Sequence, residues 1–177
     1  MGRLTSNKLT DTVQSAAKAV SEEYTADALI KFVSGLCRRL PTQEEFTKSF
    51  QNIGWSKINE YHKDISQKRR VQIALETLES IESGSWNIAS YTIEHLNPDS
   101  ADRKNANIGN LALLEENING NNADKPFKDK IDNYQDSVFK TTRNVYKRYH
   151  KEPEIFDKDF GLWRGRRLRS KVQVFFY

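Results

Sequence analysis

The sequence predicts a mainly α-helical protein, a helical bundle that carries one small element of two strands and a helix. Apolar residues recur at helical spacing through most of the first 83 residues, which is typical of helices that pack on one side. Aromatic and β-branched residues alternate with polar ones at residues 91–95, which indicates a short strand. The length of 177 residues allows a packed core. We therefore expect one compact unit with a helical part, residues 1–84, and a second part, residues 85–177.

The first two predicted helices differ in how strongly they are patterned. Residues 10–23 are helix-prone but carry only a weak apolar stripe. Residues 29–40 place apolar side chains at i, i+3, i+4, i+7 and i+11 until Pro41, which cannot continue a helix. Cys37 lies on this second helix and is the only cysteine, so we expect it to pack as a small apolar residue. A single cysteine excludes a disulfide within the chain and a cysteine zinc cluster.

Two further helices are predicted before residue 85. Thr42 and Glu45 have the spacing of a capping box, in front of a short helix that stops at Gly54. A longer helix over residues 65–83 has one apolar side, and Gly84 ends it. Its other side carries three glutamates, Glu76, Glu79 and Glu82.

A polar loop joins two predicted strands. The first strand should end near Leu96, because Pro98 cannot donate to a ladder, and His95 therefore lies at its end. Residues 97–110 are rich in Pro, Asp, Ser, Asn and Gly, which is typical of a loop. Residues 111–114 are apolar and form the second strand.

A helix should follow the second strand after another stretch of turn residues. Residues 117–124 have capping and turn chemistry. Asp124 is a candidate N-cap for a helix that has Pro126 in its first turn and continues through Ile131. The predicted order is strand, loop, strand, helix.

Four side chains in this stretch suit phosphodiester hydrolysis, which needs a base for the attacking water and a cation for the developing charge. His95 can supply the base. Glu94 and the amide of Asn119 offer hard oxygen donors, the ligands that Mg²⁺ prefers. Asn110 would brace the loop. Strand alternation sends Glu94 and His95 to opposite faces, so both serve one site only if the strand ends or twists there.

The acids of the loop give an alternative ligand set. Asp99 and Asp102 follow His95 closely and can reach a metal in place of Glu94. We rank them below Glu94. A structural histidine is the competing interpretation of His95 alone, and it is weaker for the whole ordered set of motifs.

The motifs I-E-H-x-x-P, I-G-N-L-x-L-L, N-I-N and K-P-F-x-x-K, in this order, resemble the C-terminal domain of GmrSD-type restriction endonucleases, which belong to the HNH (ββα-metal) nucleases. The resemblance implies that Glu94 and Asn119 bind the metal, that His95 is the general base, and that Asn110 orients it. The nine-residue step from Asn110 to Asn119 agrees with HNH sites that lack zinc. The family often has Asn where this chain has Asp124, which leaves the role of that position open.

The resemblance implies a Mg²⁺-dependent endonuclease, with Mn²⁺ as a substitute, that cuts or nicks double-stranded DNA in defence against foreign DNA. It also implies an N-terminal nucleotide-handling or sensor domain. This chain has no G-x-x-x-x-G-K-[ST] or G-x-G-x-x-G motif, so we expect that domain to lie elsewhere in a longer protein. Two alternatives stay open. One is a catalytically inactive DNA-binding or assembly module, and the other is an HNH nuclease acting on RNA.

Basic residues are concentrated in the last third of the chain, where they alternate with aromatic ones and suit a phosphate backbone. Solvated lysines on amphipathic helices are the competing interpretation. The predicted nucleic-acid contacts are Lys125, Lys130, Arg143, Arg164, Arg166 and Arg167.

The remaining composition restricts the class of protein. The net charge is +4, which allows nucleic acid as a partner without demanding it. The first eleven residues lack the apolar core of a signal peptide, and no run approaches the ~20 apolar residues of a membrane helix. We therefore expect a cytoplasmic protein.

Overall fold

A computed structural model describes residues 6–22, 25–38, 40–58 and 65–159. It is mainly helical with one two-stranded antiparallel sheet, which confirms the predicted fold class. The helices and strands, in chain order, are α1 (Ser6–Glu22), α2 (Ala26–Cys37), α3 (Gln43–Phe50), α4 (Ile65–Ser83), β1 (Thr92–His95), β2 (Leu111–Leu114), α5 (Glu116–Asn122), α6 (Phe127–Lys130), α7 (Lys140–Tyr149) and α8 (Glu154–Asp159). None of these described helices is long and apolar enough to cross a membrane.

The chain forms two compact units, Met1–Phe50 and Gln51–Tyr177. This division lies earlier than the expected boundary after residue 84, because α4 packs on α7 and β2 of the second unit. The candidate site therefore shares its unit with α4.

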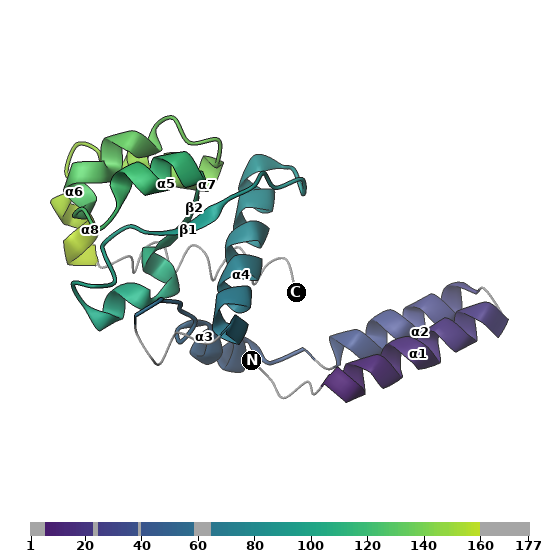
Figure 1. Cartoon of the computed structure of the whole chain (residues 1–177). Helices are drawn as coiled ribbons and strands as arrows, with labels where there is room; N and C mark the ends of the chain where they lie inside the picture. Colours follow the sequence, from purple (N-terminus) through teal and green to yellow (C-terminus); the bar gives the residue numbers. More distant parts are fainter. Residues whose placement is uncertain (1–5, 23–24, 39, 59–64, 160–177) are drawn as a thin grey trace. The chain divides into compact units, whose positions relative to one another are not determined.

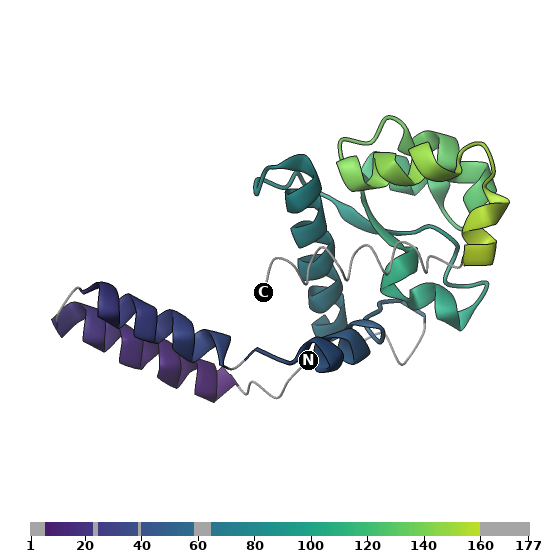
Figure 2. The same cartoon turned by 180° about the vertical axis from the view of Figure 1, so that it is seen from behind.

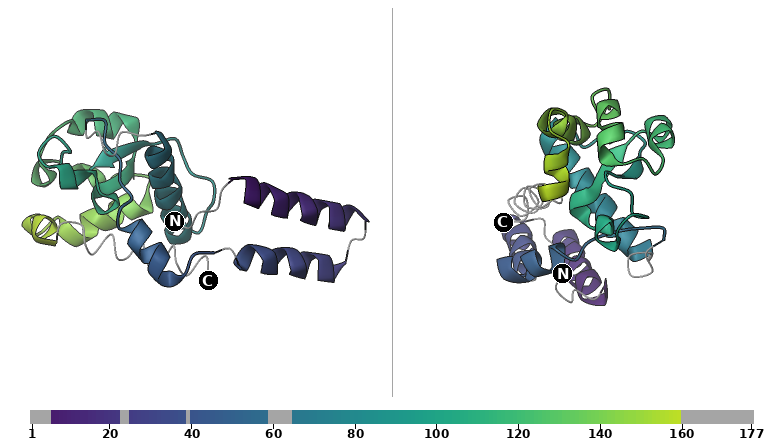
Figure 3. Two further views of the ribbon diagram at one scale, coloured as in Figure 1. Left: turned by 90° about the horizontal axis from the view of Figure 1, so that it is seen from below. Right: turned by 90° about the vertical axis from the view of Figure 1, so that its left-hand side faces the viewer.

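In the first unit, α1 and α2 run side by side as a helical hairpin (Figure 3). The capping box before α3 is confirmed: the Thr42 N–H donates to Glu45 Oε2 over 2.8 Å, and the Glu45 N–H donates to Thr42 Oγ1 over 3.3 Å. The predicted burial of Cys37 is wrong, since its side chain is exposed and α2 has no buried residue.

Helix α4 is the longest of the described helices in the second unit, and it ends at Ser83, before Gly84, whose φ of +79° favours glycine. Its apolar face is buried as predicted through Val71, Leu75 and Leu78. Glu79 was expected on the polar side, but it is only 4% exposed. From helical periodicity we predicted that Glu79 faces solvent, because the pattern of one helix cannot show that the first residues of α7 contact this side chain.

The sheet is short and lies between α4 and the group of helices α5 to α7 (Figures 1 and 2). Strands β1 and β2 pair with Glu94 opposite Ala112 and His95 opposite Leu111. Two short 3₁₀ turns, η2 (Arg103–Ala106) and η3 (Ile108–Asn110), occupy the loop between the strands.

The helix after β2 begins earlier than predicted. Residues 116–122 form α5, although we expected turn chemistry from residue 117. Asp124 does not cap the next helix, because α6 has Pro126 as its N-cap residue and no side-chain cap. The ββα element is therefore β1, β2 and α5.

A hydrophobic core joins this element to the later helices. Phe127, Tyr134 and Tyr149 are almost fully buried and pack on Leu96 and Leu114 of the strand region. Phe127 also stacks on Phe156 of α8, with ring centroids 4.3 Å apart. The core thus fixes the end of β1 against α6 and α7.

Glu79 should contribute measurably to stability, because it caps α7 from another element. Its carboxylate accepts hydrogen bonds from the backbone N–H groups of Lys140 and Thr141 and from the Thr141 hydroxyl, over 2.7–2.9 Å. Glu79→Ala should lower the free energy of unfolding by about 2 kcal/mol in urea titrations, since it leaves these donors without a partner. Glu152→Ala, at an exposed glutamate, is the control, and an equal effect of both changes would contradict the assignment.

Candidate functional site

A cleft of about 440 Å³ opens beside β1 within the second unit. It is lined by residues of α4, the segment around residue 55, β1, the loop after β1, and the segment from α5 to residue 124. The predicted site residues that line it are Glu94, His95, Asp99, Asn119 and Asp124. Strand alternation does not separate Glu94 from His95, because β1 ends at His95 and both reach the same cleft.

The imidazole of His95 is held from its Nε2 side. Nε2 lies 2.9 Å from the backbone oxygen of Trp55 and 3.6 Å from Oδ2 of Asp99. A carbonyl oxygen only accepts hydrogen bonds, so Nε2 carries the proton and donates to it. The other nitrogen, Nδ1, is then the acceptor of the neutral ring.

Trp55 supports His95 and was not singled out from the sequence. Its indole stacks on the imidazole, with ring centroids 5.7 Å apart and an interplanar angle of 25°. Its backbone N–H donates to the Ala106 oxygen over 2.8 Å, and the ammonium of Lys68 lies 4.9 Å from the centroid of its ring. A lone tryptophan after a glycine carries no local signal for a stacking partner 40 residues away.

Glu94 is nearly buried and has two strong partners. Its Oε1 lies 2.7 Å from the ammonium of Lys130 and accepts a hydrogen bond from the Tyr134 hydroxyl over 2.8 Å. Lys130 also donates to the backbone oxygen of His95 over 2.6 Å. The sequence suggested that Lys130 contacts phosphate, whereas its side chain is 1% exposed and engaged inside the protein.

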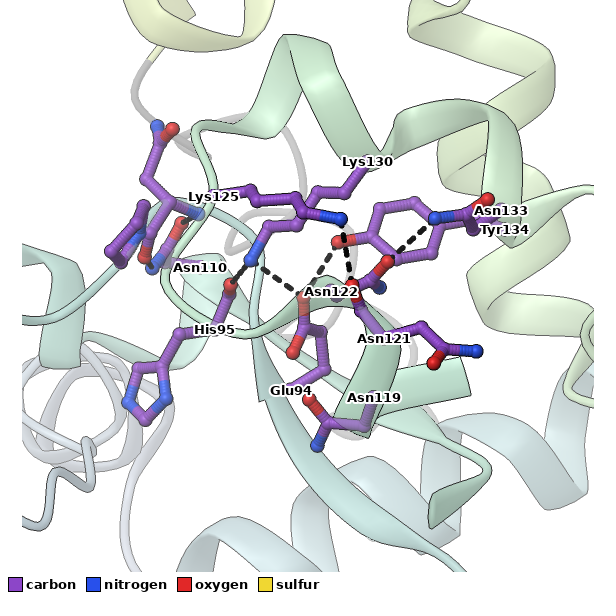
Figure 4. A network of polar contacts seen from close by, with 12 residues as sticks. Glu94, His95, Asn110, Asn119, Asn121, Asn122, Lys125, Lys130, Asn133 and Tyr134 are labelled. Carbon is purple, nitrogen blue, oxygen red and sulfur yellow. Dashed lines mark hydrogen bonds and ion pairs between the residues drawn. The ribbon is translucent and has the colours of Figure 1, made fainter. Parts of the chain in front are cut away.

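The amide of Asn119 is oriented by the strand. Its Nδ2 donates to Thr92 Oγ1 over 2.7 Å, and Thr92 Oγ1 donates in turn to the Leu114 oxygen over 3.1 Å. The nitrogen is thus turned to β1, and the amide oxygen is the group left for another ligand. Figure 4 shows this oxygen on the side of Glu94.

These donors fit a hard divalent cation. The second carboxylate oxygen of Glu94 points toward Asn119 in Figure 4, and both residues line the cleft. Among the described residues, no cluster of three or more His, Cys, Asp or Glu side chains is suited to a metal. One carboxylate and one amide oxygen suit Mg²⁺, which usually keeps several waters, better than zinc, which takes nitrogen and sulfur ligands.

Asn110 lies behind the cleft and ties the loop to the end of β1. Its Oδ1 accepts from the Asn97 N–H over 2.8 Å, and its Nδ2 donates to the oxygens of Asn97 and Asn105, each over 2.7 Å. Only 2% of the residue is exposed. This geometry ties the loop to the residues that follow β1, and the orienting role of Asn110 toward His95 stays a prediction.

Tyr91 is another ionisable group in the cleft, and it stays protonated. Burial raises the pKa of Tyr91, and the hydrogen bond that it donates to Glu76 raises it further. A tyrosine with a raised pKa is a poor base at neutral pH. Of Tyr91 and His95, the histidine is therefore the candidate base.

The remaining predicted nucleic-acid contacts do not line the cleft or lie outside the described residues. Lys125 is exposed, and its ammonium donates to the Asn121 oxygen over 2.8 Å. Arg143 is partly buried and donates to the Ser137 oxygen. His150, a histidine that was not predicted to be a site residue, is at the end of α7, where a ring nitrogen lies 2.9 Å from the Tyr146 oxygen. Outside the described residues lie Arg164, Arg166 and Arg167.

Comparison with known proteins identifies a family to which the chain is similar. A family model described as GmrSD restriction endonucleases, C-terminal domain, matches residues 40–168. This range begins after α1 and α2 and contains the whole candidate site. No curated protein and no solved structure matches the chain.

The two site asparagines should differ in their effect on stability. Asn110→Ala should lower the free energy of unfolding by on the order of 3 kcal/mol, because it removes three hydrogen bonds of a residue that is only 2% exposed. Asn119→Ala, which removes one hydrogen bond at a half-buried position, should cost less than about 1 kcal/mol. Urea unfolding followed by circular dichroism measures both, and equal losses would contradict the bracing role of Asn110.

Proposed function

The chain belongs to the family of GmrSD restriction endonuclease C-terminal domains, and from this premise we propose that it is a Mg²⁺-dependent DNA endonuclease of the HNH type. Membership supports a nuclease of a restriction system in general. The proposal adds the metal, the ββα-metal type of site and the roles of individual residues.

One observation carries the proposal. The cleft beside β1 combines a histidine whose Nε2 is held by a carbonyl with an acid and an oriented amide that offer oxygen ligands. The three residues, His95, Glu94 and Asn119, come from the strand end and helix of a ββα element. A base and a cation site in one cleft are what phosphodiester hydrolysis requires.

The protein's own groups suggest how the base works. Nδ1 of His95 takes a proton from the attacking water, and the imidazole becomes positively charged. The Trp55 carbonyl 2.9 Å from Nε2, and Asp99 3.6 Å from it, stabilise that charge. A Mg²⁺ bound by Glu94 and Asn119 would supply positive charge for the scissile phosphate and the leaving oxygen.

The substrate we propose is double-stranded DNA. Lys57 and Lys68 line the cleft, where each can lie against a phosphate of the backbone. We also propose that an N-terminal nucleotide-handling or sensor domain of a longer protein controls the cutting, and that Mn²⁺ can replace Mg²⁺. RNA as the substrate is the competing outcome of the experiment below.

His95→Ala should lower the rate of plasmid cleavage by roughly 10²- to 10⁴-fold, because a positioned base contributes about that much. Supercoiled plasmid is incubated with the protein and Mg²⁺ or Mn²⁺, with and without chelator, and nicked and linear forms are measured on gels. Wild-type protein should cut only with metal.

The control is His150→Ala, which removes a histidine at the end of α7 and should cut like wild type. Unchanged cleavage by folded His95→Ala would exclude His95 as the base. Cleavage of RNA but not of plasmid would replace DNA as the substrate. Absence of any cleavage by wild type, with DNA still bound, would favour an inactive binding module.

Asn119→Ala should lose activity that high metal partly restores, because it removes one ligand but leaves Glu94 in place. Its Mn²⁺ affinity, measured by calorimetry, should fall by about tenfold. Asn121→Ala, at an exposed asparagine on the same helix, serves as the matched control. Wild-type metal affinity in Asn119→Ala, or full rescue of Asn110→Ala by Mn²⁺, would reverse the two assignments.

A further inference from the structure

The buried ammonium of Lys130 joins two neighbouring residues of the candidate site. It lies 2.7 Å from Glu94 Oε1 and 2.6 Å from the backbone oxygen of His95 (Figure 4). The Lys130 and Glu94 side chains are only 1% and 3% exposed. The Tyr134 hydroxyl donates to the same oxygen, Oε1.

The pair is better explained by its effect on the cleft than by stability. Taking two charges out of water costs about as much as their attraction returns, so a buried ion pair is weak evidence for a stabilising role. Lys130 and Tyr134 occupy Oε1 and leave Oε2 on the side of Asn119 (Figure 4). Glu94 can therefore offer a cation one oxygen rather than two.

The same contact reduces the charge that a cation would meet. The positive charge of Lys130 offsets that of Glu94, and Asn119 is neutral. Elsewhere in the described cleft lining, the positive charges of Lys57 and Lys68 equal in number the negative charges of Asp99 and Asp124. The described lining of the free cleft thus has little net negative charge with which to attract a divalent ion.

We propose, resting on the function proposed above, that Lys130 is an internal counter-ion that keeps the free cleft nearly neutral, so that a divalent cation binds firmly only together with a phosphate of the substrate. The phosphate then supplies negatively charged oxygen ligands that the free cleft lacks. Because coupling between two ligands is reciprocal, the metal raises the affinity for DNA by the same factor as DNA raises the affinity for the metal.

Calorimetric titration of the free protein with Mn²⁺ tests the role of Lys130. Lys130→Met keeps the length of the side chain and removes its charge, and it should bind Mn²⁺ about tenfold more tightly than wild type. Lys125→Met removes the charge of an exposed lysine and should change the affinity less than about threefold, because solvent and salt screen exposed charges. Tyr134→Phe removes the other donor to Oε1 without changing the charge and should also stay within about threefold.

Two further variants show whether the gain arises through Glu94. The double variant Glu94→Gln with Lys130→Met should lose the gain, because the carboxylate charge is gone. Lys130→Arg keeps the charge and should bind Mn²⁺ as weakly as wild type. Equal or weaker Mn²⁺ binding by Lys130→Met that is folded by circular dichroism would overturn the proposal.

A measurement on wild type keeps the proposal testable if Lys130→Met does not fold. Mn²⁺ is titrated with and without a saturating short DNA duplex that carries phosphorothioate linkages to resist cutting. The affinity should be about tenfold higher with the duplex, and equal affinities would overturn the proposal. Metal-dependent cutting by wild type together with an unchanged Mn²⁺ affinity in Lys130→Met would overturn this inference alone. Absence of Mn²⁺ binding with or without duplex, together with absence of cutting, would overturn the proposed function as well.

Discussion

The arrangement of the candidate site depends on how the end of β1 is held, and Lys130 holds it. Neighbouring residues on a strand point to opposite faces, so a strand alone cannot present Glu94 and His95 to one reaction. The ammonium contacts Glu94 through its side chain and His95 through its backbone oxygen. The imidazole is thereby left for the Trp55 carbonyl on the other side. The Glu94 carboxylate is positioned by Lys130 and the His95 imidazole by the Trp55 carbonyl. Because Lys130 also contacts the His95 backbone, it fixes the two residues relative to each other.

The elements around the strand end supply the rigidity that such positioning needs. Glu79 of α4 caps α7, and Thr142 of α7 donates through its hydroxyl to the Leu113 oxygen of β2. Asn110 fastens the loop to the residues that follow β1. The short sheet could not be stable alone. It is held because residues of α5, α6 and α7 donate hydrogen bonds to the strands and α4 packs on β2.

Much of the fold follows from local patterns in the sequence, because periodicity reports which faces are apolar. The two strands follow from their apolar patterns, whereas the capping box at Thr42 and the end of α4 before Gly84 follow from residue types at fixed spacing. Helix α5 was missed because an asparagine-rich stretch has the chemistry of a turn. It forms a helix in the context of tertiary contacts, with Ile118 packed against the core and Asn119 bonded to Thr92.

The position of the site was easier to predict from the sequence than the contacts of its residues. Residue types and spacing indicated His95, Glu94 and the two asparagines as a group, and the structure brings three of them to one cleft with Asn110 behind it. Local patterns cannot show that a charged residue has a partner far along the chain. Glu79 was therefore assigned to solvent and Lys130 to phosphate, because their partners lie 61 and 35 residues away in the sequence.

The contact between Trp55 and His95 also limits how the protein can be divided. The motif that carries the site lies within residues 91–127, yet the carbonyl that contacts the His95 imidazole belongs to Trp55, 40 residues earlier. The backbone N–H of Trp55 is hydrogen-bonded to the Ala106 oxygen. A fragment that begins at the motif would keep all four site residues and lose the group that selects the tautomer of His95. The smallest transplantable unit is thus larger than the motif. Grafting the motif into another scaffold would have to include the Trp55 segment with it.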